Sequence, residues 1–295
     1  MPLYLTVAVA AYLFLALAGL IDKVLLKTAI VSPRAYAFYV GLLGVGVLIL
    51  LPFGVVARPD LRVLISALAS GVYGTYALWA FYSALKAHAA SRVITTVGAL
   101  TPVLTLLLSV LILGESLNGY QVAGFGILVL GGFLVSYREN VKKPYSLELL
   151  GHAARAAVLF AASFVLLRFV FTFEPFLNGF FWARIGGLLG ALSIVIIPEN
   201  FRRIYWATRK APPTAPLPFF FNQGLGGAGA ILQNYAIFLG SASLVAAVQG
   251  VQYVFILVLA VLLGRYLPNL KESFTPFKIL AVLVVGAGLY LISLN

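Results

Sequence analysis

One arginine lies inside an apolar run of this sequence, where a charged side chain needs an explanation. Arg184 is part of NGFFWARIGGLLGAL at residues 178–192. A guanidinium in the middle of a lipid bilayer costs about 2.5–3.5 kcal/mol unless it meets a partner or water. In the structural interpretation, backbone carbonyls or Glu174 hold the arginine. In the functional one, it binds a carboxylate or phosphate of a solute. A second arginine, Arg168, is near the end of the preceding run and is expected to reach the membrane border.

Uncharged amides are concentrated in two neighbouring apolar runs further along the chain. Pairs spaced eleven residues apart share a helix face, and so does a pair spaced three apart. These pairs are Asn222 with Gln233, Gln223 with Asn234, and Gln249 with Gln252. Amides in lipid either hold helices together or line a wet cavity. Their density in two adjacent runs favours the cavity.

Large aromatic residues recur at every third position between residues 73 and 82. Packing or lipid contact is the commoner fate of such a stripe, whereas at a cavity wall it would stack on an aromatic or heterocyclic solute. We predict that part of this stripe, the amides and the arginine together line a solute cavity. The predicted solute-binding residues are Tyr76, Trp79, Tyr82, Arg184, Gln233, Asn234, Gln249 and Gln252.

The remaining titratable residues receive structural interpretations. His88 and His152 are expected at membrane borders, each without a partner at metal-ligand spacing, so no metal site is predicted. Asp22 is expected to pair with Lys23 where the first apolar run ends. We predict no cofactor and no enzyme activity, because the sequence has no phosphate-binding loop, no HExxH motif and no nucleophile elbow.

The elements that must position these residues are membrane helices. The 295 residues are 62% hydrophobic and 9% charged, with a mean hydropathy of +1.06, which a soluble domain of this size could not bury. Apolar runs of roughly 20 residues are long enough to span a bilayer, and the lack of strict alternation argues against a barrel. The ten predicted spans are residues 3–21, 35–56, 62–85, 91–112, 117–137, 152–173, 176–197, 216–239, 241–263 and 275–293. The breaks between them include a basic, proline-rich stretch at 199–218.

Charge sets the expected orientation of these spans. Sixteen of the twenty Lys and Arg residues fall in loops after odd-numbered spans, and only Arg58 and Arg62 fall in loops after even-numbered ones. The positive-inside rule therefore places the odd loops in the cytoplasm and both termini outside. The net charge of +12 is explained by loops facing anionic lipid, so no nucleic-acid partner is predicted.

The second half of the chain repeats the first. A shift of 152 residues aligns Ala84 with Ala236 and Gly98 with Gly250 within residues 82–117 and 235–264. Each half has five predicted spans, an odd number, so the copies enter the membrane with opposite orientation, as in secondary transporters. The predicted fold is an all-α integral membrane protein of ten transmembrane helices in two inverted five-helix repeats. Residues 1–137 form the first repeat, 138–151 a cytoplasmic linker and 152–295 the second repeat.

Several segments resemble one known family. The hairpin at 82–117 with Pro102 and its LGES ending, the glycine-rich GFGILVLGGFLV at 124–135, and AVLFAASFVLLRFVF at 157–171 are similar to the drug/metabolite transporter superfamily, in particular its ten-helix EamA-type exporters. The halves differ, because Phe38 lies near the position matching Arg184 and Val254 lies where Pro102 would fall. Gly98 and Pro102 are predicted to form a gating bend.

The resemblance implies a secondary transporter that exports a small metabolite across the inner membrane by alternating access. An amino acid is the leading solute, and a sugar phosphate or nucleotide sugar carried by an antiporter is the alternative. A polytopic protein that handles lipid without transporting solute is a further alternative. The expected partners are the solute and the lipid bilayer, and the sequence is compatible with a monomer without deciding the oligomeric state.

Overall fold

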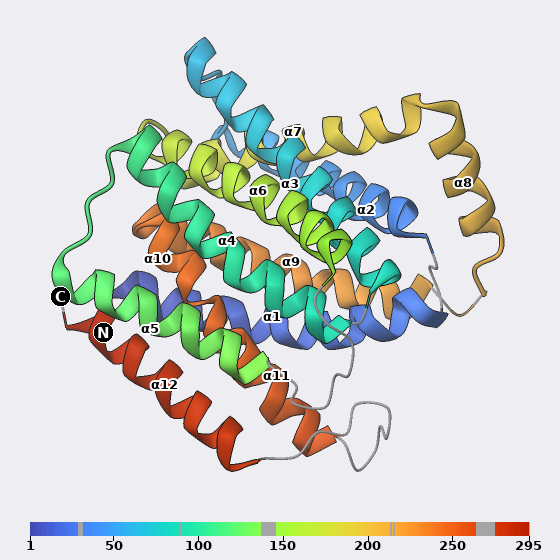
Figure 1. The fold of residues 1–295 in the computed structure, drawn as a ribbon. Helices are drawn as coiled ribbons and strands as arrows, with labels where there is room; N and C mark the ends of the chain where they lie inside the picture. The colour runs from blue at the N-terminus through green and yellow to red at the C-terminus, as the bar shows by residue number, and fades with distance from the viewer. Residues whose placement is uncertain are drawn as a thin grey trace.

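The computed structural model of the protein describes residues 1–28, 32–88, 90–136, 146–212, 214, 216–263 and 275–294. Helices make up its regular structure, and no strand occurs in these ranges. Figure 1 labels the helices in chain order. The first half contains α1 (Leu3–Thr28), α2 (Pro33–Leu42), the 3-10 helix η1 (Leu43–Phe53), α3 (Leu61–Ala87), α4 (Ala90–Leu113) and α5 (Gly119–Ser136). The second half contains α6 (Leu147–Phe171), α7 (Phe176–Ile196), α8 (Pro198–Arg209), α9 (Pro216–Leu239), α10 (Ala242–Ala247), α11 (Gln249–Leu263) and α12 (Pro276–Ser293).

Local sequence signals account for where the helices begin and end. Ser146 and Ser241 accept hydrogen bonds from Leu149 N and Leu244 N, and so cap α6 and α10. After α4, Gly114 takes a positive φ of 63°, a left-handed conformation that favours glycine. This glycine belongs to the LGES motif, whose role here is to terminate a helix.

Eight ranges in the described part of the chain are long and apolar enough to cross a membrane. α5 contributes a shorter apolar helix, Gly119–Val135, and α9 is not among the eight. Large apolar side chains also point away from the protein, with Ile49, Phe53 and Leu111 each more than 70% exposed. Such exposure suits a lipid environment and would be unfavourable in water. The chain is a multi-pass membrane protein.

Three predicted segments differ in detail from the structure. The stretch at 199–218, expected to be a break, contains the amphipathic helix α8, in which Glu199 forms a 2.6 Å ion pair with Arg203 one turn later. The predicted span 35–56 changes from an α-helix to the 3-10 helix η1 at Leu43, where Gly41, Gly44 and Gly46 lower the helix propensity. The predicted span 241–263 is interrupted at Val248, between α10 and α11.

Glycines let helices of the two halves approach closely. A Cβ added to Gly71 of α3 would lie 1.9 Å from the carbonyl oxygen of Ala183 on α7. One added to Gly186 of α7 would lie 2.2 Å from the carbonyl oxygen of Leu68. Gly124 on α5 and Gly288 on α12 form a comparable contact. The halves are therefore joined along backbone surfaces.

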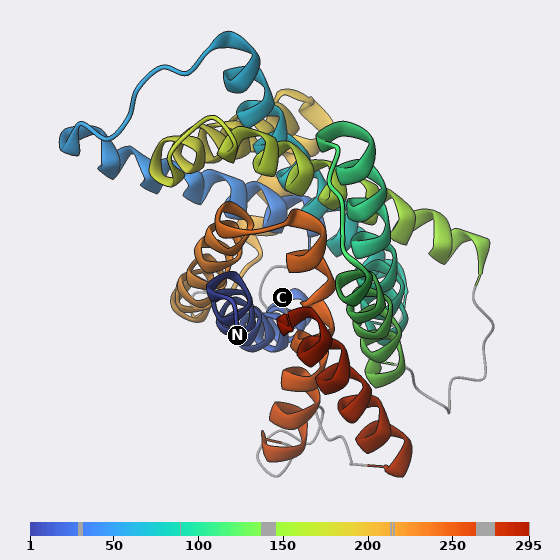
Figure 2. The same ribbon diagram turned by 90° about the vertical axis from the view of Figure 1, so that its left-hand side faces the viewer.

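Figures 1 and 2 show where the termini, η1 and α8 lie relative to the helix bundle. Both termini lie close together at one end of the bundle in Figures 1 and 2. η1 extends away from the bundle, most clearly in Figure 2, and α8 lies at the edge of the bundle next to α2 and α7. Between the packed helices lies a large central cavity.

Candidate functional site: a cavity between the two halves

The cavity has a volume of about 1570 Å³ and is lined by residues from both halves of the chain. Its lining residues come from α1, α2, η1, α3, α4 and α5 in the first half, and from α6, α7, α9 and α11 in the second. It also borders Lys86 and His88 at the end of α3, and Lys278 near the start of α12. A concave site with mostly apolar walls and a few polar groups is the usual form of a small-molecule site.

Six of the eight predicted solute-binding residues line this cavity. They are Tyr82, Arg184, Gln233, Asn234, Gln249 and Gln252. Tyr76 and Trp79 do not line it. Instead, the Tyr76 hydroxyl lies 2.9 Å from Ser193 Oγ, and the Trp79 ring lies beneath Arg34. Whether the six bind a solute remains a prediction.

The pitch of the helix explains why the aromatic stripe does not face the cavity as a whole. A spacing of three residues advances by about 300° on a helix of 3.6 residues per turn, so each successive aromatic is displaced by about 60° around α3. The cavity-facing residues of α3 instead alternate spacings of three and four, as in Gly71, Gly74 and Leu78. From the stripe, only Tyr82 coincides with that face.

Arg184 faces the cavity without a carboxylate beside it. Its guanidinium carbon lies 4.9 Å from the centre of the Phe180 ring, a cation–π contact. In the described ranges it forms no ion pair and no hydrogen bond to a carbonyl. Glu174, the acid expected as a possible partner of Arg184, instead accepts a 2.6 Å hydrogen bond from Asn178 Nδ2. The positive charge is therefore available to an anion in the cavity.

The cavity amides divide into bonded and unbonded groups. Gln233 Nε2 donates to the Tyr12 hydroxyl at 3.1 Å, and that hydroxyl donates to the carbonyl of Val245 at 2.8 Å. Tyr12 is therefore a cavity residue that the sequence analysis missed. Three other amides make no hydrogen bond within the described part of the chain and so can bind a solute. They are Asn234, Gln249 and Gln252.

A partly buried acid at the cavity edge, Asp22, was not predicted from the sequence to take part in a site. Asp22 of α1 accepts hydrogen bonds from Tyr36 of α2, from Asn222 Nδ2 of α9 at 2.6 Å and from Tyr82 of α3 at 3.3 Å. The side chain of Lys23, its expected partner, lies outside the described part of the structure. A single carboxylate thus connects four helices and both halves.

A second acid joins the halves at another place. Glu115, just after α4, accepts hydrogen bonds from Ser241 and, at 2.8 Å, from Ser243, both at the start of α10. Nearby in sequence, the carbonyls of Ile237 and Phe238 accept hydrogen bonds of 3.1 and 2.8 Å from Arg168 Nη1. Arg168 therefore binds the end of α9, and its expected position near a membrane border stays a prediction.

The two residues predicted to form a gating bend lie in an unbroken helix. α4 runs through Pro102, which is buried, and Gly98 borders the cavity. A Cβ added to Gly98 would lie 1.5 Å from the hydroxyl of Tyr253 on α11, so this glycine makes room for a tyrosine of the other half. Gating by Gly98 and Pro102 stays a prediction.

The two histidines are in contact, contrary to the expectation that neither has a partner. His88 Nε2 lies 3.1 Å from His152 Nδ1, although 64 residues separate them. Sequence spacing could not reveal this pair, because the contact forms between the end of α3 and the first turns of α6.

Comparison with known proteins adds one family and one fold. Residues 2–137 match the EamA-like transporter family. No curated protein sequence matches the chain. A solved crystal structure covers 99% of this chain and 96% of its own, with a TM-score of 0.69 at 20% sequence identity, a similarity that supports the fold alone.

Proposed function

We propose that the protein is a secondary transporter of the EamA-like transporter family, within the drug/metabolite transporter superfamily, because residues 2–137 match that family. It exports a small anionic or zwitterionic metabolite, such as an amino acid, across the inner membrane. Both termini lie on the outer side. Transport proceeds by alternating access, in which two inverted five-helix halves expose the central cavity first to one side and then to the other.

The pairing of helices supports an inverted repeat. α1 and α6 are the first helices of the two halves, and α3 and α9 correspond to the third predicted span of each half. α1 packs on α9, and α6 packs on α3, so the first helix of each half meets the third of the other. The second helices, α2 and α7, pack on each other, as do the fifth, α5 and α12. This exchange of partners is what a two-fold relation between the halves requires.

The observation that carries the proposal is an arginine in a cavity between the halves that forms no ion pair with any residue in the described part of the chain. Arg184 places a positive charge at the wall, and Gln249 and Gln252 add amides without partners in the described structure. An arginine can bind a carboxylate with two parallel hydrogen bonds, and amides can both donate to and accept from the rest of a polar solute. A small carboxylate-bearing metabolite fits this set of groups.

Alternating access requires contacts between the halves that break in turn. The hydrogen bond of Asn222 to Asp22 and that of Ser243 to Glu115 both connect the first half to the second. We assign them to opposite ends of the transport path, because the predicted orientation puts the end of α1 inside and the end of α4 outside. Each is small enough in energy to break during a cycle.

Flux into proteoliposomes tests the function. The purified protein would be assayed against amino acids, nucleosides and sugar phosphates, with and without a pH gradient and with solute preloaded on the opposite side. Saturable flux or exchange of a carboxylate-bearing metabolite is expected. Selective transport of a phosphate ester would favour the antiporter alternative, and no flux above empty liposomes for any solute would contradict the proposal.

One observation favours lipid handling as an alternative function. This alternative can be tested in the same liposomes. η1 contributes Gly46 and Ile49 to the cavity wall, and Ile49 is also 71% exposed. The cavity therefore reaches an element with a strongly exposed apolar surface. Movement of a fluorescent phospholipid between leaflets in the same liposomes, without solute flux, would support lipid handling instead.

A further inference from the structure

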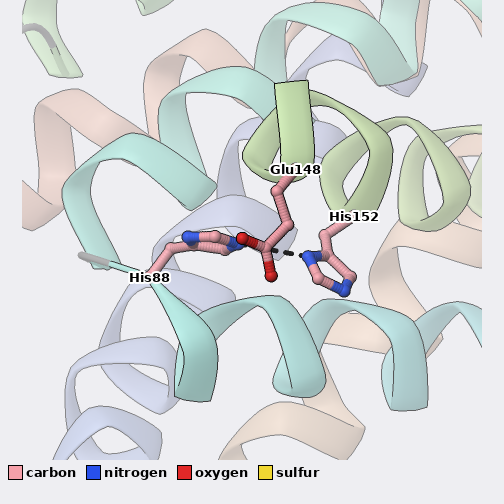
Figure 3. Close-up of side chains that lie close together, drawn as sticks. All are labelled: His88, Glu148 and His152. Carbon is pink, nitrogen blue, oxygen red and sulfur yellow. Dashed lines mark hydrogen bonds between the residues drawn. The ribbon is translucent and has the colours of Figure 1, made fainter. Parts of the chain in front are cut away.

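Both histidines of the chain converge on one glutamate. The sequence contains two His and no Cys, and the two imidazoles meet although they lie on different helices. Glu148 and His152 are four residues apart in the first turns of α6, so they share a helix face, and His88 follows the last residue of α3. Figure 3 shows the three side chains pointing toward one another.

The separations between donor atoms match those of a metal site. His88 Nε2 and His152 Nδ1 are 3.1 Å apart. Two nitrogens that bind one Zn²⁺ at about 2.0–2.1 Å in tetrahedral geometry are separated by about 3.3 Å. A carboxylate oxygen of Glu148 and the two nitrogens all lie within 4.8 Å of one another. A small side-chain rotation of the exposed glutamate would complete a three-ligand set.

We propose that His88, Glu148 and His152 bind a divalent transition-metal ion of the zinc class. Two neutral imidazoles and one carboxylate are a common ligand set for Zn²⁺ with a fourth position left to water. His88 would coordinate through Nε2 and His152 through Nδ1. The present contact between these nitrogens is a hydrogen bond through one shared proton, and the ion would take the place of that proton.

The position of this site is accessible and connects the two halves. Glu148 is exposed, both histidines are partly exposed, and His88 also borders the central cavity. α3 belongs to the first half and α6 to the second, and the two helices pack on each other. A bound ion would therefore hold the halves together at the end of α3.

Binding of Zn²⁺ alone to the purified full-length protein tests the site. The protein would carry an affinity tag without histidine, because the chain itself has only these two imidazoles and no thiol. Calorimetry and competition with a chelating indicator are expected to give one ion per chain. His88→Gln and His152→Gln should each weaken binding by at least about 10-fold, since even the outer partners of metal ligands contribute that much. Glu148→Gln should also weaken it.

The matched control removes a different exposed acid at a helix start. Glu199→Gln on α8 should leave Zn²⁺ binding unchanged, because Glu199 pairs with Arg203 and lies outside the cluster. Each variant would be checked for folding by its elution volume and helicity. Equal Zn²⁺ binding by the wild type and both histidine variants would overturn the proposal, as would equal loss in Glu199→Gln.

A spectroscopic readout keeps the test independent of any variant. Co²⁺ in place of Zn²⁺ should give the visible absorption of a four-coordinate site with nitrogen ligands in the wild-type protein. The weak spectrum of an all-oxygen, six-coordinate ion would overturn the proposal.

A consequence for transport rests on the proposed function. If the halves move as proposed, Zn²⁺ should slow flux in the wild-type protein and leave His152→Gln unaffected. Binding and flux are measured separately, so the two hypotheses fail separately. Zn²⁺ binding without any transported solute would remove the transport proposal and keep the site. Flux without Zn²⁺ binding would remove the metal site and keep the transport proposal.

Discussion

The amide nitrogen of Asn222 on α9 lies 2.6 Å from the carboxylate of Asp22 on α1, so the second half of the chain donates a hydrogen bond to a partly buried acid of the first. The hydroxyl of Tyr36 donates to the same carboxylate oxygen. Two hundred residues separate Asn222 from Asp22. The two halves are therefore connected by hydrogen bonds to Asp22 at the edge of the cavity.

Removing the Tyr36 hydroxyl should weaken the hydrogen bonding at Asp22 and so lower the stability of the protein. Tyr36→Phe leaves the buried ring in place but removes a hydrogen bond to a carboxylate, which contributes about 1.5–3 kcal/mol. We expect a lower thermal unfolding temperature in detergent. Tyr39→Phe on the same helix is the control, because the Tyr39 hydroxyl contacts Thr208 at an exposed position. Equal stability of the two variants would mean that the Asp22 network contributes little.

Removing the charge of Arg184 should affect solute affinity. A charge-assisted hydrogen bond of about 1.5–3 kcal/mol corresponds to a KM raised about 10- to 100-fold for a carboxylate-bearing solute in Arg184→Gln. Proteoliposome flux over a range of concentrations measures this. Arg209→Gln on α8 is the control, since Arg209 is exposed and stacks on Trp206. An unchanged KM in Arg184→Gln would exclude Arg184 from the binding site.

Arg168 should behave differently from Arg184, because it satisfies backbone groups. Its guanidinium binds the carbonyls of Ile237 and Phe238, and Arg168→Met would leave both without this donor. We expect a loss of about 1–3 kcal/mol in stability, the usual cost of an unsatisfied buried polar group, seen as a lower unfolding temperature. The KM of the remaining folded protein should be unchanged. A raised KM at normal stability would indicate solute contact instead.

A methyl group at Gly98 should disturb the cavity wall. The added Cβ would overlap the Tyr253 side chain, which is itself buried, so α4 or α11 must shift. Gly98→Ala is expected to reduce flux by at least about 10-fold, since small misplacements within a site have effects of this size or larger. Gly126→Ala on α5 is the matched control, because its Cβ would meet nothing within 4 Å. Equal flux in both variants would argue against any gating role for Gly98.

Hydropathy and charge were sufficient to predict most of the helical architecture. Each of the ten predicted spans overlaps a helix or a consecutive pair of helices, because about 20 apolar residues in lipid must form a helix to satisfy their backbone. The amphipathic helix α8 was missed, since its low apolar content and flanking prolines are typical of a loop. The interruption at Val248 was also missed, because no proline or charged residue marks it in the sequence.

The candidate site could be predicted only in part. Arg184 and the amides Gln249 and Gln252 stood out because polar groups are costly in apolar helices, and all three line the cavity. Tyr12 and Asp22 did not stand out. The first is an ordinary aromatic residue in an apolar run, and the second lies where a helix was expected to leave the membrane.

The sequence by itself determined that this chain lies in a membrane, which segments are helical and which of them carry unusual polar groups. These properties depend on composition and on contacts within one helix, so they can be read locally. Only the tertiary structure decided which side chains meet, as with Asn222 and Asp22 or His88 and His152. These contacts depend on how each helix is rotated about its axis and on which helices pack together, and glycines such as Gly71 and Gly186 set that packing across more than a hundred residues of chain.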